Sequence, residues 1–286
     1  MLDTILDSPL SPWLQHDTDA TDHIVISSRI RLARNFDGIL FTNRNDTSSL
    51  EKVNTISRGL LQPLKEADGH QYSNINLEQL SERERAILVE KHLMSPALEE
   101  KLPYRNLVVS DDASIVIMVN EEDHLRIQSM VSGLRLQKAY EHAKKIDKAI
   151  EAKYPYAFDE RFGYLTACPT NVGTGLRASV MLHLPALTIS GRITRLIRSI
   201  IQLGYSVRGL YGEGSEALGN IYQISNQRTM GVSEEDTIEQ LTKIVEGIIA
   251  EERKSRQSLL HNDKEGLEDV LWRSFGVLQY ARRVNG

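Results

Sequence analysis

Several features that define large classes of proteins are scarce or missing in this chain. It has one cysteine, Cys168, so an internal disulfide is excluded and a reducing compartment is favoured. No apolar run reaches the roughly 18 residues that a membrane-spanning helix needs. The N-terminus, MLDTILDSPLSPWLQ, is acidic and interrupted by prolines, unlike a signal peptide. We therefore expect a soluble, cytoplasmic protein that does not bind membranes.

The chain also lacks an excess of positive charge, internal repeats and low-complexity linkers. Its net charge of -5 argues against direct binding of nucleic acid over a broad surface. The content of hydrophobic residues, 41%, and of charged residues, 26%, is typical of a soluble globular enzyme. A chain of 286 residues is long enough for one large domain and a smaller appendage.

A glycine-rich stretch, CPTNVGTGLRASVML at 168–182, lacks the lysine of a P-loop. Gly173-Thr-Gly-Leu-Arg-Ala178 and Gly212-Glu-Gly-Ser-Glu-Ala217 both fit the loose G-x-G-x-x-A pattern of dinucleotide-binding sites. That pattern requires a helix after the turn. The residues after Gly175 alternate between apolar and polar and predict a strand instead. We interpret both matches as accidental.

The spacing of apolar residues predicts several strands. They are expected at 23–32, 107–110, 114–126, 163–167, 177–184 and 205–208, and Asp111-Asp112 should form the turn of a hairpin. In the first strand, Ser27, Arg29 and Arg31 should share one face, because side chains alternate along a strand. Ile24, Ile26, Ile30 and Leu32 should share the other face. If 114–126 stays extended, Asn120, Glu122, His124 and Arg126 line one face.

Helices are predicted between and after these strands. A polar, helical region covers about 48–94 and contains a capping box, Ser81 to Glu84. Further helices are expected at 133–153, at 193–203, after the cap Ser233-Glu-Glu-Asp236, and from about residue 264. We divide the chain into an N-terminal segment, 1–23, a mixed catalytic domain, 24–254, and a helical C-terminal region, 255–286.

Five arginines lie on or at the ends of apolar strands: Arg29, Arg31, Arg126, Arg177 and Arg208. A single arginine in such a place is most often solvated or part of an ion pair. Five together indicate convergence on a polyanion, because guanidinium groups bind phosphate oxygens bidentately and keep their charge when partly desolvated. A triphosphate held in this way needs neither a P-loop lysine nor the glycine loop of protein kinases.

Four motifs carry a resemblance to a known family. SSRIRLARN at 27–35, NEEDHLRI at 120–127, CPTNVGTGLRASV at 168–180 and RGLYGE at 208–213 resemble the successive signatures of the phosphagen (guanidino) kinases, in the family's order. The resemblance covers roughly residues 20–254. It implies an α+β fold in which helices flank an antiparallel sheet, with Mg²⁺ and ATP held over the sheet by arginines.

The resemblance also implies the residues of the ATP site. Besides the five arginines, His92 matches the position beside the adenine, although a surface histidine on a helix is the alternative reading. Neighbouring motif residues complete the expected ATP site: Ser27, Ser28, Ile30, Ala178, Ser179, Val180, Met181, Gly209, Leu210, Tyr211, Gly212 and Glu213. ATP is then a co-substrate and Mg²⁺ its cofactor, and no side chain is assigned as a metal ligand.

Three residues match the acceptor side of the family's active site: Glu122, Glu213 and Cys168. A guanidinium group is protonated at biological pH and is a poor nucleophile. Two carboxylates can hold it in line with the γ-phosphoryl group, and one can accept its proton. Nearby cations would favour the thiolate of Cys168, which could orient the guanidinium. The alternative readings are surface or ion-paired glutamates and a cysteine packed in the core.

The motif SSRIR begins only at Ser27, so the helical N-terminal domain that closes on small substrates is expected to be absent. This architecture resembles the bacterial protein arginine kinases, which phosphorylate arginine side chains and mark proteins for Clp-type degradation in stress responses. The implied partners are proteins with exposed arginines, an activator protein, the Clp protease machinery and a second copy in a homodimer. Such relatives continue past the position of Gly286 into a longer helical region that binds phosphoarginine.

Two other functions remain open from the sequence. The first is a kinase of free arginine or another small guanidine. The second is a non-catalytic adaptor that binds nucleotide or phosphoarginine. The presence of both Glu122 and Glu213 with the arginine set argues against the adaptor.

Overall fold

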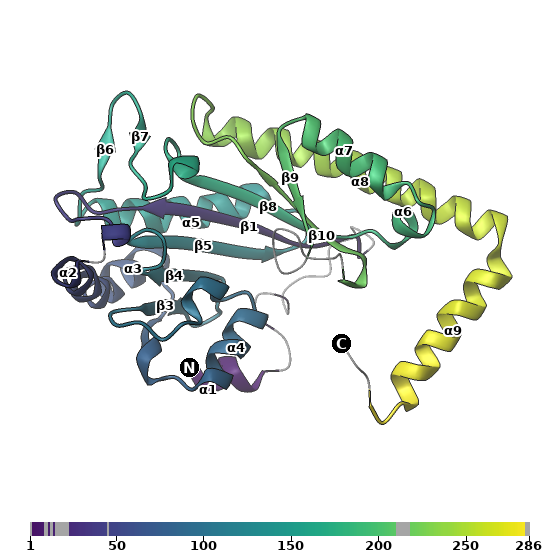
Figure 1. Ribbon diagram of the computed structural model, residues 1–286, viewed down its shortest axis with the longest axis horizontal. Coiled ribbons are helices and arrows are strands. Elements are labelled where there is room, and N and C mark those ends of the chain that lie inside the picture. The colour runs from purple at the N-terminus through teal and green to yellow at the C-terminus, as the bar shows by residue number, and fades with distance from the viewer. Residues whose placement is uncertain are drawn as a thin grey trace.

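A computed structural model describes residues 2–8, 11, 14, 23–44, 46–209 and 218–283. In these parts of the chain, eight strands form one sheet in the order β2-β3-β4-β5-β1-β8-β10-β9, and all neighbouring strands are antiparallel (Figure 1). The strands are β1 (Val25–Arg34), β2 (Tyr72–Asn76), β3 (Asn106–Ser110), β4 (Ile115–Val119), β5 (Leu125–Ser132), β8 (Leu176–His183), β9 (Tyr205–Arg208) and β10 (Ile221–Asn226). A separate hairpin pairs β6 (Phe158–Asp159) with β7 (Gly163–Tyr164).

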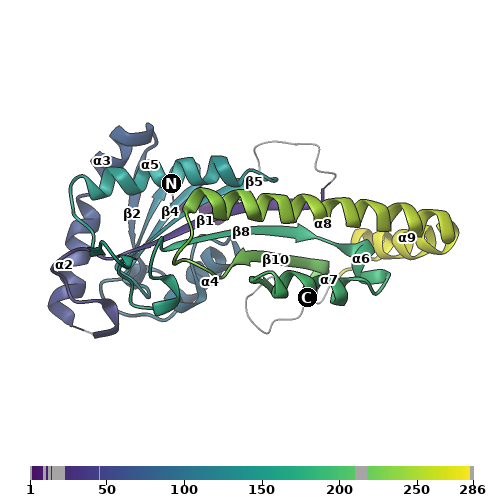
Figure 2. The ribbon, with the colours of Figure 1, turned by 90° about the horizontal axis from the view of Figure 1, so that it is seen from above.

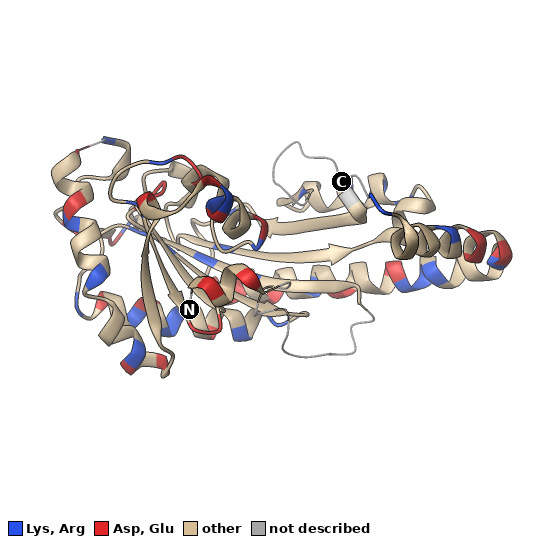
Figure 3. Cartoon of the chain, turned by 90° about the horizontal axis from the view of Figure 1, so that it is seen from below, with Lys and Arg blue, Asp and Glu red and all other residues tan. Residues whose placement is uncertain are grey.

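Helices flank this sheet, so the expected α+β class with an antiparallel sheet is confirmed. The helices are α1 (Leu2–Asp7), α2 (Thr47–Arg58), α3 (Leu61–Asp68), α4 (Glu82–Glu90), α5 (Leu136–Glu151), α6 (Pro185–Ile189), α7 (Ile193–Gln202), α8 (Glu234–Asn262) and α9 (Lys264–Tyr280). Figure 2 shows α5 and α8 along one side of the sheet and α4 on the other. Figure 3 shows positive and negative residues mixed along α8.

The two faces of the sheet are buried to different extents. On the face toward α5 and α8, apolar side chains from the whole length of the sheet form the larger core, which includes Ile30, Leu32 and Val180. On the opposite face, a smaller core beneath α1 and α4 covers only β2 to β5 and includes Leu107 and Met118. The remainder of this second face, over the start of β5 and over β1, β8, β10 and β9, carries the arginines.

Strand β1 largely follows the alternation that the sequence predicts. Arg29 and Arg31 lie on the second face, and Ile30 and Leu32 are buried on the first. Ile26 was expected on the apolar face, but the pairing with β8 shifts between Val25 and Ser27. This irregularity takes Ile26 out of the alternation and leaves it half-buried.

The prediction of one extended strand over 114–126 is wrong. β4 ends at Val119, and Asn120 adopts a left-handed conformation with φ of 56°. Its N–H donates to the carbonyl of His124 at 3.0 Å, which closes a tight turn before β5. Asparagine tolerates this conformation better than most residues. Asn120, Glu122, His124 and Arg126 therefore do not line one face of a strand.

Other elements were missed or shortened in the prediction. The region 48–94 contains strand β2, which pairs with β3, and β10 inserts between β8 and β9. The strand expected at 163–167 is paired only as β7. The capping box at Ser81 is confirmed in both directions, and so are the helices expected around 193–203, after Ser233 and from about 264.

Helix α8 runs without interruption through the domain boundary placed at residue 254. Within it, Glu252 is fully buried and accepts hydrogen bonds from the N–H groups of Ala186 and Leu187, both at 3.0 Å. The last buried side chain of α8 is that of Ser255. The described side chains of α9 are all exposed or half-exposed, and the helix stands apart from the sheet, beyond the far end of α8 (Figure 1). Among the described residues, no helix has the length and apolar character needed to cross a membrane.

Candidate active site

The register of the sheet brings the arginines together on its second face. Arg31 lies directly opposite Arg177 across the pair of β1 and β8. Arg126 lies opposite Ala33, and Arg208 lies opposite Gln223. Like charges directly opposite each other destabilise a sheet. The fold therefore concentrates positive charge where an anionic ligand would relieve it.

Two of the arginines, Arg29 and Arg177, are oriented by neutral hydrogen-bond partners. Arg29 Nη2 donates to Gln223 Oε1 at 2.9 Å, and Arg177 Nη2 donates to Ser225 Oγ at 3.0 Å and to Ser206 Oγ at 3.1 Å. Arg31 Nε is buried and has no hydrogen-bond partner among the described residues. Serine and glutamine acceptors fix the direction of a guanidinium without neutralising its charge.

The concentration of charge is visible in the pKa values of these side chains. Burial, followed by the charges of Arg126, Arg177 and Arg208, lowers the pKa of Arg29 to about 10. Burial and then the charges of Arg29 and other arginines lower the pKa of Arg31 well below its usual value. Both shifts mean that the positive charge is less favourable in the free protein than in water.

Two adjacent glutamates contact the arginine cluster. Arg126 Nη1 lies 2.7 Å from Glu121 Oε1, and Arg126 Nη2 lies 3.7 Å from Glu122 Oε2. The side chain of Glu121 is 5% exposed, and its Oε2 has no hydrogen-bond partner among the described residues. The side chain of Glu122 is 43% exposed. The sequence analysis missed Glu121, although it is the first glutamate of NEEDH.

The remaining residues of the NEEDH motif hold the two glutamates in place. Asp123 Oδ1 accepts hydrogen bonds from Asn35 Nδ2 at 2.7 Å and from the N–H of Ala167 at 2.6 Å. His124 Nδ1 accepts from the N–H of Phe36 at 3.0 Å, so Nε2 carries the proton and donates to the carbonyl of Leu40 at 2.9 Å. Burial lowers the pKa of His124, in agreement with a neutral ring.

A cavity of about 300 Å³ lies between the arginines and helix α4. Apolar side chains, Val89, Met94 and Met118, line it together with His92, and Arg29 and Arg208 lie at its charged end. Burial and then the charge of Arg29 lower the pKa of His92 to about 4, so its ring is neutral at physiological pH. A cavity with one apolar end and one cationic end suits a nucleotide.

A second cavity, of about 450 Å³, adjoins the arginines on the side of the 168–175 loop. Glu122 and Cys168 line it, and the two cavities share Arg31, Arg126 and Arg208. Cys168 is half-buried, and its Sγ lies 3.0 Å from Thr170 Oγ1. A carboxylate and a sulfur atom thus lie beside the same guanidinium groups that border the first cavity.

The structure divides the predicted ATP-site residues into three groups. Ser27, Ser179 and Met181 share the face of the arginines. Ser28, Ile30, Ala178 and Val180 lie on the opposite face, in or beside the larger core. Gly209 directly follows β9 and is buried, whereas Leu210, Tyr211, Gly212 and Glu213 lie outside the described residues. ATP binding by these residues and the acceptor role of Glu213 stay predictions.

The sequence and the fold match those of guanidino phosphotransferases. A sequence model of the ATP:guanido phosphotransferase C-terminal catalytic domain matches residues 52–255. The chain belongs to this family.

Known relatives and solved structures agree with this assignment. The protein-arginine kinase of Bacillus cereus (strain AH187) is 46% identical over 284 residues, which cover 99% of this chain and 79% of the relative. That of Bacillus anthracis (strain CDC 684 / NRRL 3495) is 46% identical over 286 residues, with the same coverage. A lombricine kinase has a TM-score of 0.71 and 25% identity, over 88% of this chain and 71% of that one. The duplicated taurocyamine kinase of Schistosoma mansoni with bound transition-state analogue components has a TM-score of 0.71 and 26% identity, over 87% of this chain and 35% of that one.

The lowered pKa of His92 predicts a pH dependence of stability. The pKa of His92 is about 4 in the folded protein and 6.5 in the unfolded chain. The contribution of His92 to the free energy of unfolding is therefore fully present above pH 6.5. This contribution is lost as the pH falls from 6.5 toward 4, because the unfolded chain then binds a proton that the folded protein does not. We expect the free energy of unfolding of the parent to fall between pH 6.5 and 4 more steeply than that of His92→Gln, by the slope of about one proton.

Urea unfolding at a series of pH values measures this difference. His261→Gln, at an exposed position of α8, is the matched control and should follow the parent. Parallel curves for the parent and His92→Gln would contradict the assignment.

Proposed function

We propose that this chain transfers the γ-phosphoryl group of ATP to the guanidino group of arginine side chains in proteins. The observation that supports this most strongly is the junction of the two cavities at Arg31, Arg126 and Arg208. A phosphoryl group bound by these arginines would face the nucleotide cavity on one side and Glu122 and Cys168 on the other. The curated relatives with 46% identity are protein-arginine kinases.

In the proposed complex, the adenine lies near His92 and the phosphates lie on the arginines of the sheet. Arg29, Arg126, Arg177 and Arg208 bind phosphate oxygens, and Arg31 lies at their centre. Phosphoryl transfer requires mainly positioning and neutralisation of charge on the transferred group. Guanidinium groups fixed by serine and glutamine side chains provide both without rearrangement.

The described residues also fit a Mg²⁺ ion bound with the nucleotide. Mg²⁺ prefers oxygen ligands and is often held by one or two carboxylates together with phosphates and water. Glu121 lines the nucleotide cavity, and its buried Oε2 is without a partner among the described residues. Glu121 would hold the ion directly or through water. When bound, Mg²⁺ supplies additional positive charge beside the phosphates.

On the acceptor side, Glu122 orients the guanidinium of the substrate and accepts its proton. A guanidino nitrogen forms a bond to the γ-phosphorus, the bond from that phosphorus to the β,γ-bridging oxygen breaks, and ADP leaves. The proton released from the attacking nitrogen passes to the Glu122 carboxylate. Cys168 contacts the guanidinium from the other wall of the cavity. Glu213 remains the predicted second carboxylate.

A protein-bound arginine is the acceptor that these features favour. Glu122 is 43% exposed and Cys168 is half-buried, so the reacting end of a long side chain could reach them from solvent. The further partners, an activator protein, a Clp-type protease and a second copy of the chain, stay proposals from the family resemblance.

Replacing Glu122 tests the acceptor half of the proposal. Glu122→Gln keeps the size of the side chain but removes the charge that accepts the proton. We expect phosphoarginine formation to fall by about a hundredfold or more while the Kd for ATP changes little. Mass spectrometry of acid-labile phosphoarginine and calorimetric ATP titration measure the two effects.

Glu99→Gln provides the matched control, because Glu99 is exposed and its side chain makes no hydrogen bond or ion pair among the described residues. If Glu122→Gln formed phosphoarginine at a near-normal rate, the proton acceptor would be another group.

The choice of acceptor is tested by competition between substrates. We expect an unstructured protein rich in arginine to be phosphorylated with a higher kcat/KM than free L-arginine. A dedicated site for free arginine must also bind its α-carboxylate and α-ammonium groups. The same protein with lysine in place of arginine should remain unlabelled. A higher kcat/KM for free L-arginine would support the small-guanidine kinase instead.

A further inference from the structure

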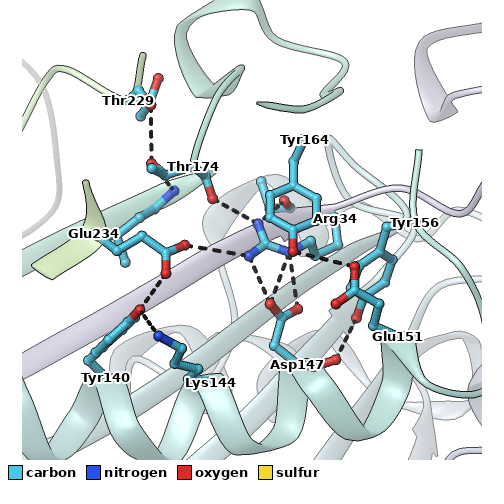
Figure 4. A network of polar contacts seen from close by, with 12 residues as sticks. Arg34, Tyr140, Lys144, Asp147, Glu151, Tyr156, Tyr164, Thr174, Thr229 and Glu234 are labelled. Atoms are coloured by element: carbon cyan, nitrogen blue, oxygen red, sulfur yellow. Dashed lines mark hydrogen bonds and ion pairs between the residues drawn. The ribbon is translucent and has the colours of Figure 1, made fainter. Parts of the chain in front are cut away.

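Arg34 is the one arginine of the SSRIRLAR motif that points away from the arginine cluster. It ends β1 on the face toward α5, and its side chain is 1% exposed. Arg34 Nη2 lies 2.8 Å from Asp147 Oδ2, and Nε lies 3.0 Å from Asp147 Oδ1. Glu234 Oε1 is 3.8 Å from Nη2 (Figure 4). The guanidinium is therefore neutralised from the direction of α5 and α8.

The other arm of the same guanidinium contacts the glycine turn. Arg34 Nη1 donates to the carbonyl of Thr174 at 2.9 Å and to that of Ala33 at 2.9 Å. Its Cζ lies 3.6 Å from the centre of the Tyr164 ring. The backbone of Tyr164 exchanges hydrogen bonds with Gly173, at 2.8 and 3.2 Å. Arg34 thus touches the turn both directly and through Tyr164 (Figure 4).

The turn fits closely against these contacts. Gly175 has φ of +63°, and a Cβ atom there would lie 2.7 Å from Arg34 Nη1. On the other side, the N–H of Thr174 donates to the carbonyl of Thr229 at 2.9 Å. The one hydroxyl proton of Thr229 is shared between the carbonyls of Thr170 and Val172, whose oxygens lie 2.9 and 2.7 Å from Oγ1. Arg34 and Tyr164 therefore contact the segment between Cys168 and Arg177 on one side, and Thr229 contacts it on the other.

We propose that Arg34 is a positioning residue for phosphoryl transfer, which holds the 173–175 turn so that Cys168 and Arg177 keep their places in the site. This inference rests on the proposed function. Arg34 touches neither cavity that we assign to the substrates. It acts through the carbonyl of Thr174 and the ring of Tyr164.

The planar fork of arginine is essential to this role. A lysine at position 34 could keep an ion pair with Asp147, but a single ammonium group cannot also reach the Thr174 carbonyl and stack flat on Tyr164. If Arg34 served only to join β1 to α5, its loss would affect stability alone. The two roles therefore predict different effects of a conservative substitution.

Arg34→Lys is the test, read by three measurements on the full chain. We expect kcat for phosphoarginine formation to fall at least about tenfold, because Cys168 and Arg177 lose the geometry that transfer requires. The Kd for ATP should rise by a smaller factor than kcat falls, because the other arginines that bind phosphate stay in place. The alkylation rate of Cys168 by iodoacetamide should change at least about threefold, because its loop is released. Arg83→Lys, at an exposed position of α4, is the matched control and should behave as the parent.

Asp147→Asn should give the reverse pattern. It removes the charge that neutralises Arg34 but leaves the hydrogen bond from Arg34 Nη1 to the carbonyl of Thr174. The free energy of unfolding should therefore fall, while kcat and the alkylation rate of Cys168 change little. If Arg34→Lys does not fold, Tyr164→Leu, which removes the ring stacked on Arg34, is tested by the same three measurements. Unchanged kcat and alkylation in a folded Arg34→Lys or Tyr164→Leu would overturn the proposal. An Asp147→Asn variant that loses kcat in proportion to its stability would also overturn it.

The alkylation rates separate this inference from the proposed function. If the parent forms no phosphoarginine, the proposed function fails. The comparison of Cys168 alkylation between the parent and Arg34→Lys still decides whether Arg34 holds the turn.

Discussion

Repulsion among arginines on one face of the sheet is the constraint around which the rest of the site is organised. Arg31 and Arg177 are direct cross-strand neighbours, and burial and mutual repulsion lower the pKa of Arg29 and Arg31. Such an arrangement costs stability in the free protein. It persists because the opposite face is packed along the length of the sheet against α5 and α8. Proteins often hold such strain at sites where a ligand relieves it.

The alternation of side chains along the strands separates function from stability. In β1, Arg29 and Arg31 face the site while Ile30 and Leu32 fill the larger core. Arg34 follows the same alternation onto the packed face, where Asp147 neutralises it. One motif thus supplies phosphate-binding arginines on one face and a support for the glycine turn on the other.

The sequence indicated most of the site, because motif residues and strand alternation are local signals. Four of the five arginines line one cavity with Glu122 and Cys168, and Arg29 lines the adjoining one. Glu121 was missed because its role depends on burial beside Arg126, which no spacing reveals. Strand β10 is short, and its place between β8 and β9 depends on long-range pairing.

The turn within NEEDH was missed for a different reason. Positions 120–124 are all polar, so no apolar pattern marks where one strand ends and the next begins. The hydrogen bonds from the Asn120 side chain to the carbonyls of Leu50 and Tyr104 fix a left-handed residue there. These partners are distant along the chain. Local pattern therefore predicted a strand where tertiary contacts impose a turn.

The most direct test of the central constraint is the stability of Arg31→Met with and without ATP. Thermal unfolding in a buffer free of polyvalent anions should show that Arg31→Met is more stable than the parent without nucleotide, because a repelled charge is removed. Added ATP should stabilise the parent more than the variant. Adenosine, which lacks the phosphates, should stabilise each protein less than ATP does. A less stable nucleotide-free variant, or equal stabilisation of both proteins by ATP, would contradict the account.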